Sequence, residues 1–107
     1  MLEMRCDADT WYLDGFVQSK EEYVGLISQE LMHPLDRWYH VAFTVKNCRQ
    51  ATFVNGQKEV EGTIRFSPIL EGTTSIGVRQ NKISWFRGVI YSISVTDKPL
   101  SPNEFKQ

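Results

Sequence analysis

The strand expected over 38–46 constrains this chain more than any other segment. Val41, Phe43 and Val45 alternate with smaller or polar residues, which is the period-2 pattern of a strand with one face in a core. We assign Trp38, at the start of this strand, to the core.

A hairpin is expected directly after this strand. The segment 50–55 reads as a second strand, and it runs into Asn55 and Gly56, the strongest two-residue hairpin signal. A type I′ turn needs positive φ at both central residues, which glycine adopts freely and asparagine at little cost. The return strand is expected over 58–66, so these strands form an antiparallel meander.

Short strands separated by turn signals recur along the whole chain, as in all-β sandwiches and barrels. The last segment alternates over its full length, with Val89, Tyr91, Ile93 and Val95 on one face. Ser101 followed by Pro102 favours a one-turn helix, because serine caps helices and proline suits the first helical position. The other strands are expected over 2–6, 10–18, 22–28, 73–78 and 85–96.

Five short motifs in this order resemble the laminin-G-like domains of the concanavalin A-like lectin and glucanase superfamily, which includes the pentraxins. They are WYHVA at 38–42, FVNG at 53–56, SIG at 75–77, FRGVI at 86–90 and LSP at 100–102. The resemblance implies an antiparallel β-sandwich of the laminin-G-like or jelly-roll kind. Such domains are usually longer, with these motifs in their C-terminal half, so the chain is either a short variant or a piece of a larger domain that lacks N-terminal strands. Missing strands leave unpaired edges, which invite a homodimer.

Composition excludes several classes of partner. The 107 residues, 41% of them hydrophobic, suit one domain over 1–107. A formal charge of −1 without basic runs argues against nucleic acid. No apolar stretch is long enough to insert in a membrane, and no signal peptide is visible at the start. The resemblance implies an extracellular or cell-surface location, and a cytosolic one stays open.

Two cysteines are too few for a disulfide framework or a zinc site. Cys6 and Cys48 either pair across a long loop or are two small buried hydrophobic residues. We favour the second alternative and leave the disulfide open.

The chain lacks the residue patterns of the common hydrolases. No Gly-x-Ser-x-Gly motif accompanies the two histidines, so we interpret His40 as a structural strand residue and His33 as solvated. Glucanases of the superfamily use clustered carboxylates, of which one attacks and one donates a proton. Glu59 and Glu61 would share a strand face, but no third carboxylate follows, and a solvated face explains them better. We expect no enzyme activity.

A metal site is left open by the sequence. Relatives in the superfamily bind Ca²⁺ at the sandwich rim, and a hard cation of this kind takes six to eight oxygen ligands. No loop concentrates such ligands here, and Asp14 with Gly15 is expected to form a turn. The candidate ligands are Asp7, Asp9, Asp14, Asn81 and Asp97.

The loop 77–85 is the best candidate for ligand binding. Arg79, Gln80 and Asn81 offer paired hydrogen bonds, and Trp85 offers a flat surface on which a sugar ring can stack. Alternatively, the loop is a polar hairpin whose Trp85 turns into the core.

These observations favour a non-catalytic recognition module that binds a glycan or a protein and forms part of a larger extracellular or surface protein. The first alternative is an assembly domain that pairs through exposed strand edges as a homo-oligomer. The second is an inactive or partial glycoside hydrolase domain.

Overall fold

The computed structural model describes residues 1–19, 22–65, 74–78, 81–83 and 85–105 of the chain. Its regular structure there consists of strands and one turn of 3₁₀ helix, which confirms the predicted all-β class. The elements are β1 (Leu2–Asp7), β2 (Thr10–Ser19), β3 (Glu22–Ile27), β4 (His33–Pro34), β5 (Val41–Lys46), β6 (Arg49–Val54), β7 (Gln57–Thr63) and the 3₁₀ helix η1 (Pro102–Glu104).

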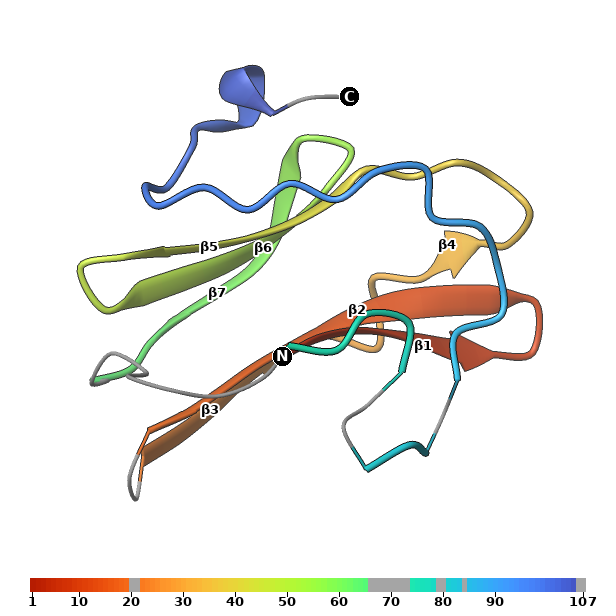
Figure 1. Cartoon of the computed structure of the whole chain (residues 1–107), viewed down its shortest axis with the longest axis horizontal. Coiled ribbons are helices and arrows are strands. Elements are labelled where there is room, and N and C mark those ends of the chain that lie inside the picture. Colours follow the sequence, from red (N-terminus) through yellow and green to blue (C-terminus); the bar gives the residue numbers. More distant parts are fainter. Residues whose placement is uncertain (20–21, 66–73, 79–80, 84, 106–107) are drawn as a thin grey trace.

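The strands form two antiparallel sheets, which lie as two layers in Figure 1. The first sheet has the order β1-β2-β3, and the short β4 pairs with the beginning of β2. The second sheet has the order β5-β6-β7. The predicted antiparallel β-sandwich is therefore confirmed.

Two glycines allow the layers to approach each other closely. A Cβ atom on Gly15 of β2 would lie 2.9 Å from Cγ2 of Thr52 in β6. A Cβ atom on Gly62 of β7 would lie 2.8 Å from Cδ2 of Leu26 in β3. Both distances are shorter than a real Cβ contact, so a side chain at either glycine would push the sheets apart.

The core lies between β2 and the second sheet. Trp11, Leu13 and Val54 form its centre, and Tyr39 and Val41 pack against them. Other buried hydrophobic residues are Leu26, Phe53 and Ile64. The alternation predicted for β5 is thus correct: Val41 contacts the core, and Phe43 lies against Gly15.

The assignment of Trp38 to the core was wrong. Trp38 is 69% exposed and makes an edge contact with Tyr91, with 6.4 Å between the ring centroids. β5 begins at Val41, whereas the strand was expected to begin at residue 38. Tyr39 shares the parity of Val41 and takes the buried position, so Trp38 faces outward.

The predicted hairpin at residues 55 and 56 is confirmed. β6 ends at Val54, β7 begins at Gln57, and these two residues are register partners. Asn55 has φ 50° and Gly56 has φ 78°, the positive values that a type I′ turn requires.

The C-terminal part differs from the prediction. The structure has no strand over 85–96 or in the described part of 73–78, although both were expected to be strands. Val89, Tyr91 and Val95 are largely exposed because no partner strand covers the alternating face. Periodicity shows which face a strand would bury. A strand also needs a neighbouring strand with which its backbone can form hydrogen bonds.

The predicted helix turn at residues 101–105 is confirmed by η1. The backbone N–H of Ser101 donates to Oε1 of Glu104 at 3.1 Å, the reciprocal bond of a capping box. Phe105 follows the helix and packs edge-on against Phe53, with centroids 5.3 Å apart. The helix thereby covers one end of the outward face of the second sheet (Figure 1).

Both cysteines are exposed free thiols, so the interpretation of buried hydrophobic residues was wrong. Cys48 lies in the two-residue turn between β5 and β6 with φ 65°. Cys6 lies on β1, an edge strand of the first sheet. Residues in turns and at sheet edges contact solvent. The number of cysteines in the sequence does not show that Cys6 and Cys48 lie at such places.

Candidate functional site

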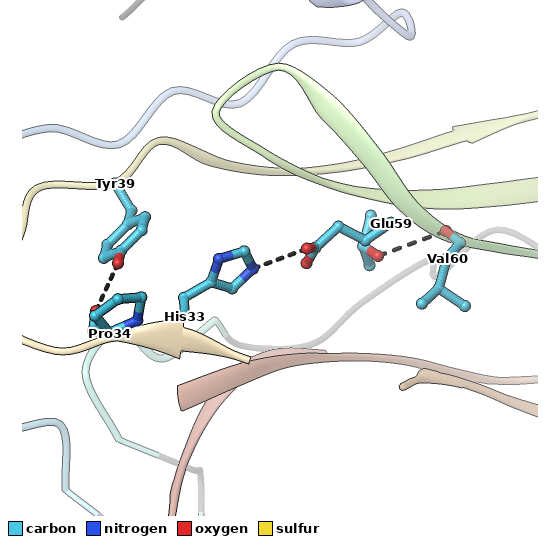
Figure 2. A network of polar contacts seen from close by, with 6 residues as sticks. His33, Pro34, Tyr39, Glu59 and Val60 are labelled. Carbon is cyan, nitrogen blue, oxygen red and sulfur yellow. Dashed lines mark hydrogen bonds and ion pairs between the residues drawn. The ribbon is translucent and has the colours of Figure 1, made fainter. Parts of the chain in front are cut away.

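A polar pair joins the two sheets inside the sandwich. Nε2 of His33 in β4 lies 2.8 Å from Oε2 of Glu59 in β7 (Figure 2). The His33 side chain is 22% exposed and the Glu59 side chain 11%. The expectation of a solvated His33 was therefore wrong, because β4 pairs with β2 and turns the imidazole toward the second sheet.

A bulge in the second sheet directs Glu59 toward His33. Thr52 pairs with Val60 and Phe53 pairs with Lys58, so Glu59 is the extra residue on β7. The bulge changes the parity of the strand. Glu61 consequently lies on the other side and pairs with Nζ of Lys58 at 3.0 Å. The expectation that both glutamates share one solvated face was wrong.

Aromatic rings enclose the imidazole of His33. Its centroid lies 4.8 Å from that of Trp11 and 5.6 Å from that of Tyr39. The Tyr39 hydroxyl donates to the carbonyl oxygen of Pro34 at 2.5 Å, also drawn in Figure 2. These contacts fix the histidine in the core, where it serves as a link between the layers.

This arrangement differs from the carboxylate pair of a glycosidase. Such a mechanism needs one carboxyl group to attack and a second to donate a proton across the same bond. The Glu59 carboxylate is occupied by His33, and Glu61, two residues away, faces the opposite side. Sequence periodicity could not reveal the His33–Glu59 pair, because an uninterrupted alternation gives no sign of the bulge.

His40 precedes β5 and is not a strand residue, which differs from the expectation, and its ring is held by packing. Its ring stacks on Phe105 with centroids 5.3 Å apart and an interplanar angle of 25°. Its backbone N–H donates to Oδ1 of Asn55 at 2.9 Å, which ties the β5 entry to the hairpin turn. Nδ1 is buried and has no hydrogen-bond partner among the described residues, so packing holds the ring.

The loop predicted to bind ligand is described in part. Arg79 and Gln80 lie outside the described residues. Asn81 is exposed, and its Oδ1 accepts the backbone N–H of Ile83 at 3.1 Å. Trp85 is 65% exposed, so it does not turn into the core. The alternative of a core tryptophan was therefore wrong, while ligand binding by this loop stays a prediction.

The calcium candidates are not brought together in the part of the chain that the structure describes. Within it, no group of three or more His, Cys, Asp or Glu residues could hold a metal ion. Asp14 is buried and pairs with Nε of Arg5 at 2.8 Å. Asp14 and Gly15 lie in the middle of β2, so the predicted turn at this place was wrong.

Comparison with known proteins agrees with the fold. The laminin G-type family model of the concanavalin A-like lectin/glucanases superfamily matches residues 3–106, and the chain belongs to this superfamily. No curated protein matches the chain. No solved structure matches it either. At the level of the superfamily, the domain is a carbohydrate- or protein-binding type of module, although the same superfamily also contains glucanases. Among the described residues, no helix is long and apolar enough to cross a membrane.

Proposed function

We propose that residues 1–107 form a single non-catalytic recognition domain that binds a glycan or a protein at the loop 77–85. The observation that carries this proposal is the indole of Trp85, which is 65% exposed in the same loop as the exposed, polar Asn81. A large aromatic ring on the surface is costly unless it contacts something, and such rings are enriched in binding sites.

The chemistry of the loop suits a saccharide. The indole face can cover the apolar face of a sugar ring. The Asn81 side chain uses its Oδ1 within the loop, which leaves its Nδ2 hydrogens for a ligand hydroxyl. Arg79 and Gln80, outside the described residues, would add further paired donors. Membership of a superfamily that includes lectins supports the same assignment, and with it a location outside the cell or at its surface.

The proposal is non-catalytic because the two glutamates nearest to a glycosidase pattern have other partners. Glu59 pairs with His33 inside the sandwich, and Glu61 pairs with Lys58 on the outer face. A carboxylate that links the layers is poorly placed to attack a bound substrate, since attack needs free approach to the carboxyl oxygen.

The test is a screen of the isolated domain on a glycan array, followed by affinity measurements on two tryptophan variants. Trp85→Ala is expected to abolish binding of the selected glycan while the melting temperature stays within a few degrees. Trp38→Ala is the matched control, because Trp38 is exposed to a similar degree but lies outside the loop. Retained binding in Trp85→Ala, or equal loss in both variants, would refute the assignment.

A second function is favoured by the edge of the first sheet. Leu2 and Met4 of β1 lie opposite Gly15 and Leu13 of β2, so their side chains share the inward face. They are nevertheless 37% and 38% exposed, and β1 is an edge strand of the first sheet. An open edge with an apolar inward face suits pairing with a second copy. Light scattering tests this alternative: a stable dimer that Met4→Lys dissociates supports assembly, and a monomer at high concentration excludes it.

A further inference from the structure

Residues 89–96 form an extended segment that pairs with no described strand. The segment contains no turn or bend, and none of its residues has a positive φ. Among the described residues, no backbone hydrogen bond joins it to the rest of the chain. Figure 1 shows it as a blue trace on the side of the second sheet. The segment therefore has the course of a strand without the neighbour that a strand needs.

One face of this segment is apolar and lies in solvent. Its four side chains are Val89, Tyr91, Ile93 and Val95, which are 73%, 88%, 53% and 92% exposed. Side chains of an extended chain alternate, so these four share one face, with Ser92 and Ser94 on the other. The row exposes roughly 500 Å² of apolar surface, at the upper end of what monomers show, and such patches mark interaction sites.

The segment also lacks the residues that keep an exposed strand from pairing. Natural proteins protect open edges with charged side chains, prolines or bulges. The sequence VIYSISVT over 89–96 contains no charged residue, no proline and no glycine, and the first such residues after it are Asp97, Lys98 and Pro99. A stretch of this composition favours pairing with another strand.

β1 offers an open edge with backbone groups at the right positions. The amino group of Met1 donates to the carbonyl oxygen of Phe16 at 2.6 Å, and the N–H of Phe16 donates back at 2.8 Å. In an antiparallel ladder such two-way pairs recur at every second residue. Leu2, Met4 and Cys6 therefore direct their N–H and C=O groups away from β2, toward the edge of the sheet.

The side chains of the same three residues present an apolar face. The register partners of Met4 and Cys6 are Leu13 and Trp11, which face the core. Register partners share a face, so Leu2, Met4 and Cys6 point to the same side of the sheet. If 89–96 pairs with β1 through its odd-numbered residues, its apolar row continues the apolar face of β1. Backbone parity and side-chain parity thus agree.

A second copy is the molecule that can bring these two elements together. In one chain the segment is held at the second sheet: Tyr91 contacts Trp38, which precedes β5, and Phe105 packs on Phe53 of β6. β1 belongs to the first sheet (Figure 1). Two copies related by a two-fold axis can each supply one segment and one edge. Two such contacts reach the range of about 1,200–2,000 Å² that stable interfaces bury.

We propose that the segment 89–96 of one copy pairs antiparallel with β1 of a second copy, and that the second copy returns the same contact. The pairing rests on the assembly function proposed for the β1 edge, and it assigns the strand that this edge binds. It involves no residue of the loop 77–85, so glycan binding there can succeed or fail separately.

The experiment is disulfide crosslinking with Cys6 as the native probe, because Cys6 is an exposed free thiol on β1. Cys48→Ser removes the other native thiol. Val89→Cys and Tyr91→Cys, each added to this variant, cover two registers that differ by two residues. Opposed residues of antiparallel strands have Cα atoms about 4.5–5.5 Å apart, which a disulfide can bridge.

Mild oxidation is expected to give a covalent dimer with at least one of these two variants. Mass spectrometry of the digested dimer should find Cys6 joined to the introduced cysteine. Ser92→Cys in the same background is the matched control, because Ser92 is exposed in the same segment but lies on the opposite face. It should give little dimer.

A second measurement needs no added cysteine. Light scattering of Tyr91→Lys should show a dimer dissociation constant raised by about a hundredfold or more, because the variant places an unpaired charge in the interface. Ser92→Lys adds the same charge on the other face and should leave the constant unchanged. Both residues are exposed in the single chain, so the melting temperature of the monomer should stay the same in both variants.

Several results would overturn the pairing. Dimers joined from Cys6 to Cys6 in Cys48→Ser alone would show that two β1 edges meet, which supports assembly but refutes the role of 89–96. A disulfide within one chain would show that the segment folds back on its own β1. Equal crosslinking by Ser92→Cys would indicate random collision, and a ladder of larger species would refute the closed dimer. A monomer at high concentration would refute both the pairing and the assembly function.

Discussion

His33 and Glu59 join the two sheets of this protein through a contact of 2.8 Å between Nε2 and Oε2. His33 comes from β4 in the first sheet, and Glu59 from the bulge of β7 in the second. The layers also meet through apolar packing around Trp11 and Val54, and the backbone N–H of Arg65 after β7 donates to Oε2 of Glu22 in β3 at 3.0 Å. The pair is thus a directional contact in a small core, and it fixes how β7 lies over β4.

Breaking this pair should destabilise the domain. His33→Ala leaves the carboxylate of Glu59 in a largely enclosed position without its partner and removes a ring from Trp11. We expect a loss of about 2 kcal/mol in the free energy of unfolding. Glu59→Gln should cost less, and the double variant should cost less than the sum of the two, by about 1 kcal/mol. Urea denaturation measures all three, and strict additivity would show that the pair is not coupled.

Two tryptophans should differ sharply when replaced by alanine. Trp11 is 1% exposed at the centre of the core, so Trp11→Ala should cost about 3–5 kcal/mol. Trp38 is mostly exposed, so Trp38→Ala should cost less than about 1 kcal/mol. Chemical denaturation under identical conditions compares them. A similar cost for both variants would mean that Trp38 is covered in solution by a strand or a second copy.

A methyl group at Gly15 should separate the layers. Gly15→Ala would place Cβ 2.9 Å from Cγ2 of Thr52, which is fully buried and has a stiff, β-branched side chain. We expect a loss of about 1–3 kcal/mol. Gly25→Ala is the control, because its Cβ would meet only the Tyr23 side chain, with Oη at 3.5 Å and Cζ at 3.9 Å, which are ordinary contacts. The Gly25→Ala variant should unfold at the same temperature as the parent domain or at a slightly higher one.

The turn between β1 and β2 offers a stabilising substitution. Ala8 has φ 53°, a left-handed value that costs an L-residue roughly 1–2 kcal/mol, and glycine avoids this cost. After the entropy cost of glycine, Ala8→Gly should still stabilise the domain by up to about 1 kcal/mol. Ala42→Gly, the same exchange inside β5, should destabilise it by about 0.5–1 kcal/mol. Melting temperatures that move in the same direction would contradict the assignment of strain at Ala8.

The capping box of η1 gives a prediction for pH dependence. The pKa of Glu104 is lowered, first by the hydrogen bond from the Ser101 hydroxyl and then by that from its backbone N–H. A lowered folded-state pKa means that the cap stabilises the helix turn above the unfolded value of 4.5 and is lost as the pH falls below it. Carboxyl NMR titration should show this low pKa, and Ser101→Ala should raise it toward 4.5. An unchanged pKa in the variant would contradict the contact.

The features that the sequence predicted correctly depend on neighbouring residues. Asn55 and Gly56 can adopt positive φ, so they form the turn wherever the hairpin lies. Ser101 and Pro102 begin a helix turn for equally local reasons. The alternation of Val41 and Phe43 predicted correctly which side chains share a face. Continued back along the chain, the same alternation puts Tyr39 on that face and Trp38 on the opposite face. Trp38 was nevertheless assigned to the core.

The features that were missed depend on partners far away in the chain. The bulge that turns Glu59 toward His33 forms because β7 must match β6 and meet β4 at once, and nothing near Glu59 in the sequence encodes it. The sequence left two positions open for Trp85, exposed in the loop or turned into the core, and only the structure decided that it is exposed. The sequence by itself determined turns, caps and the relative faces of strands, because these follow from local backbone and side-chain chemistry. Only the tertiary structure decided which face is covered and which polar groups meet, because burial and pairing are properties of two surfaces together.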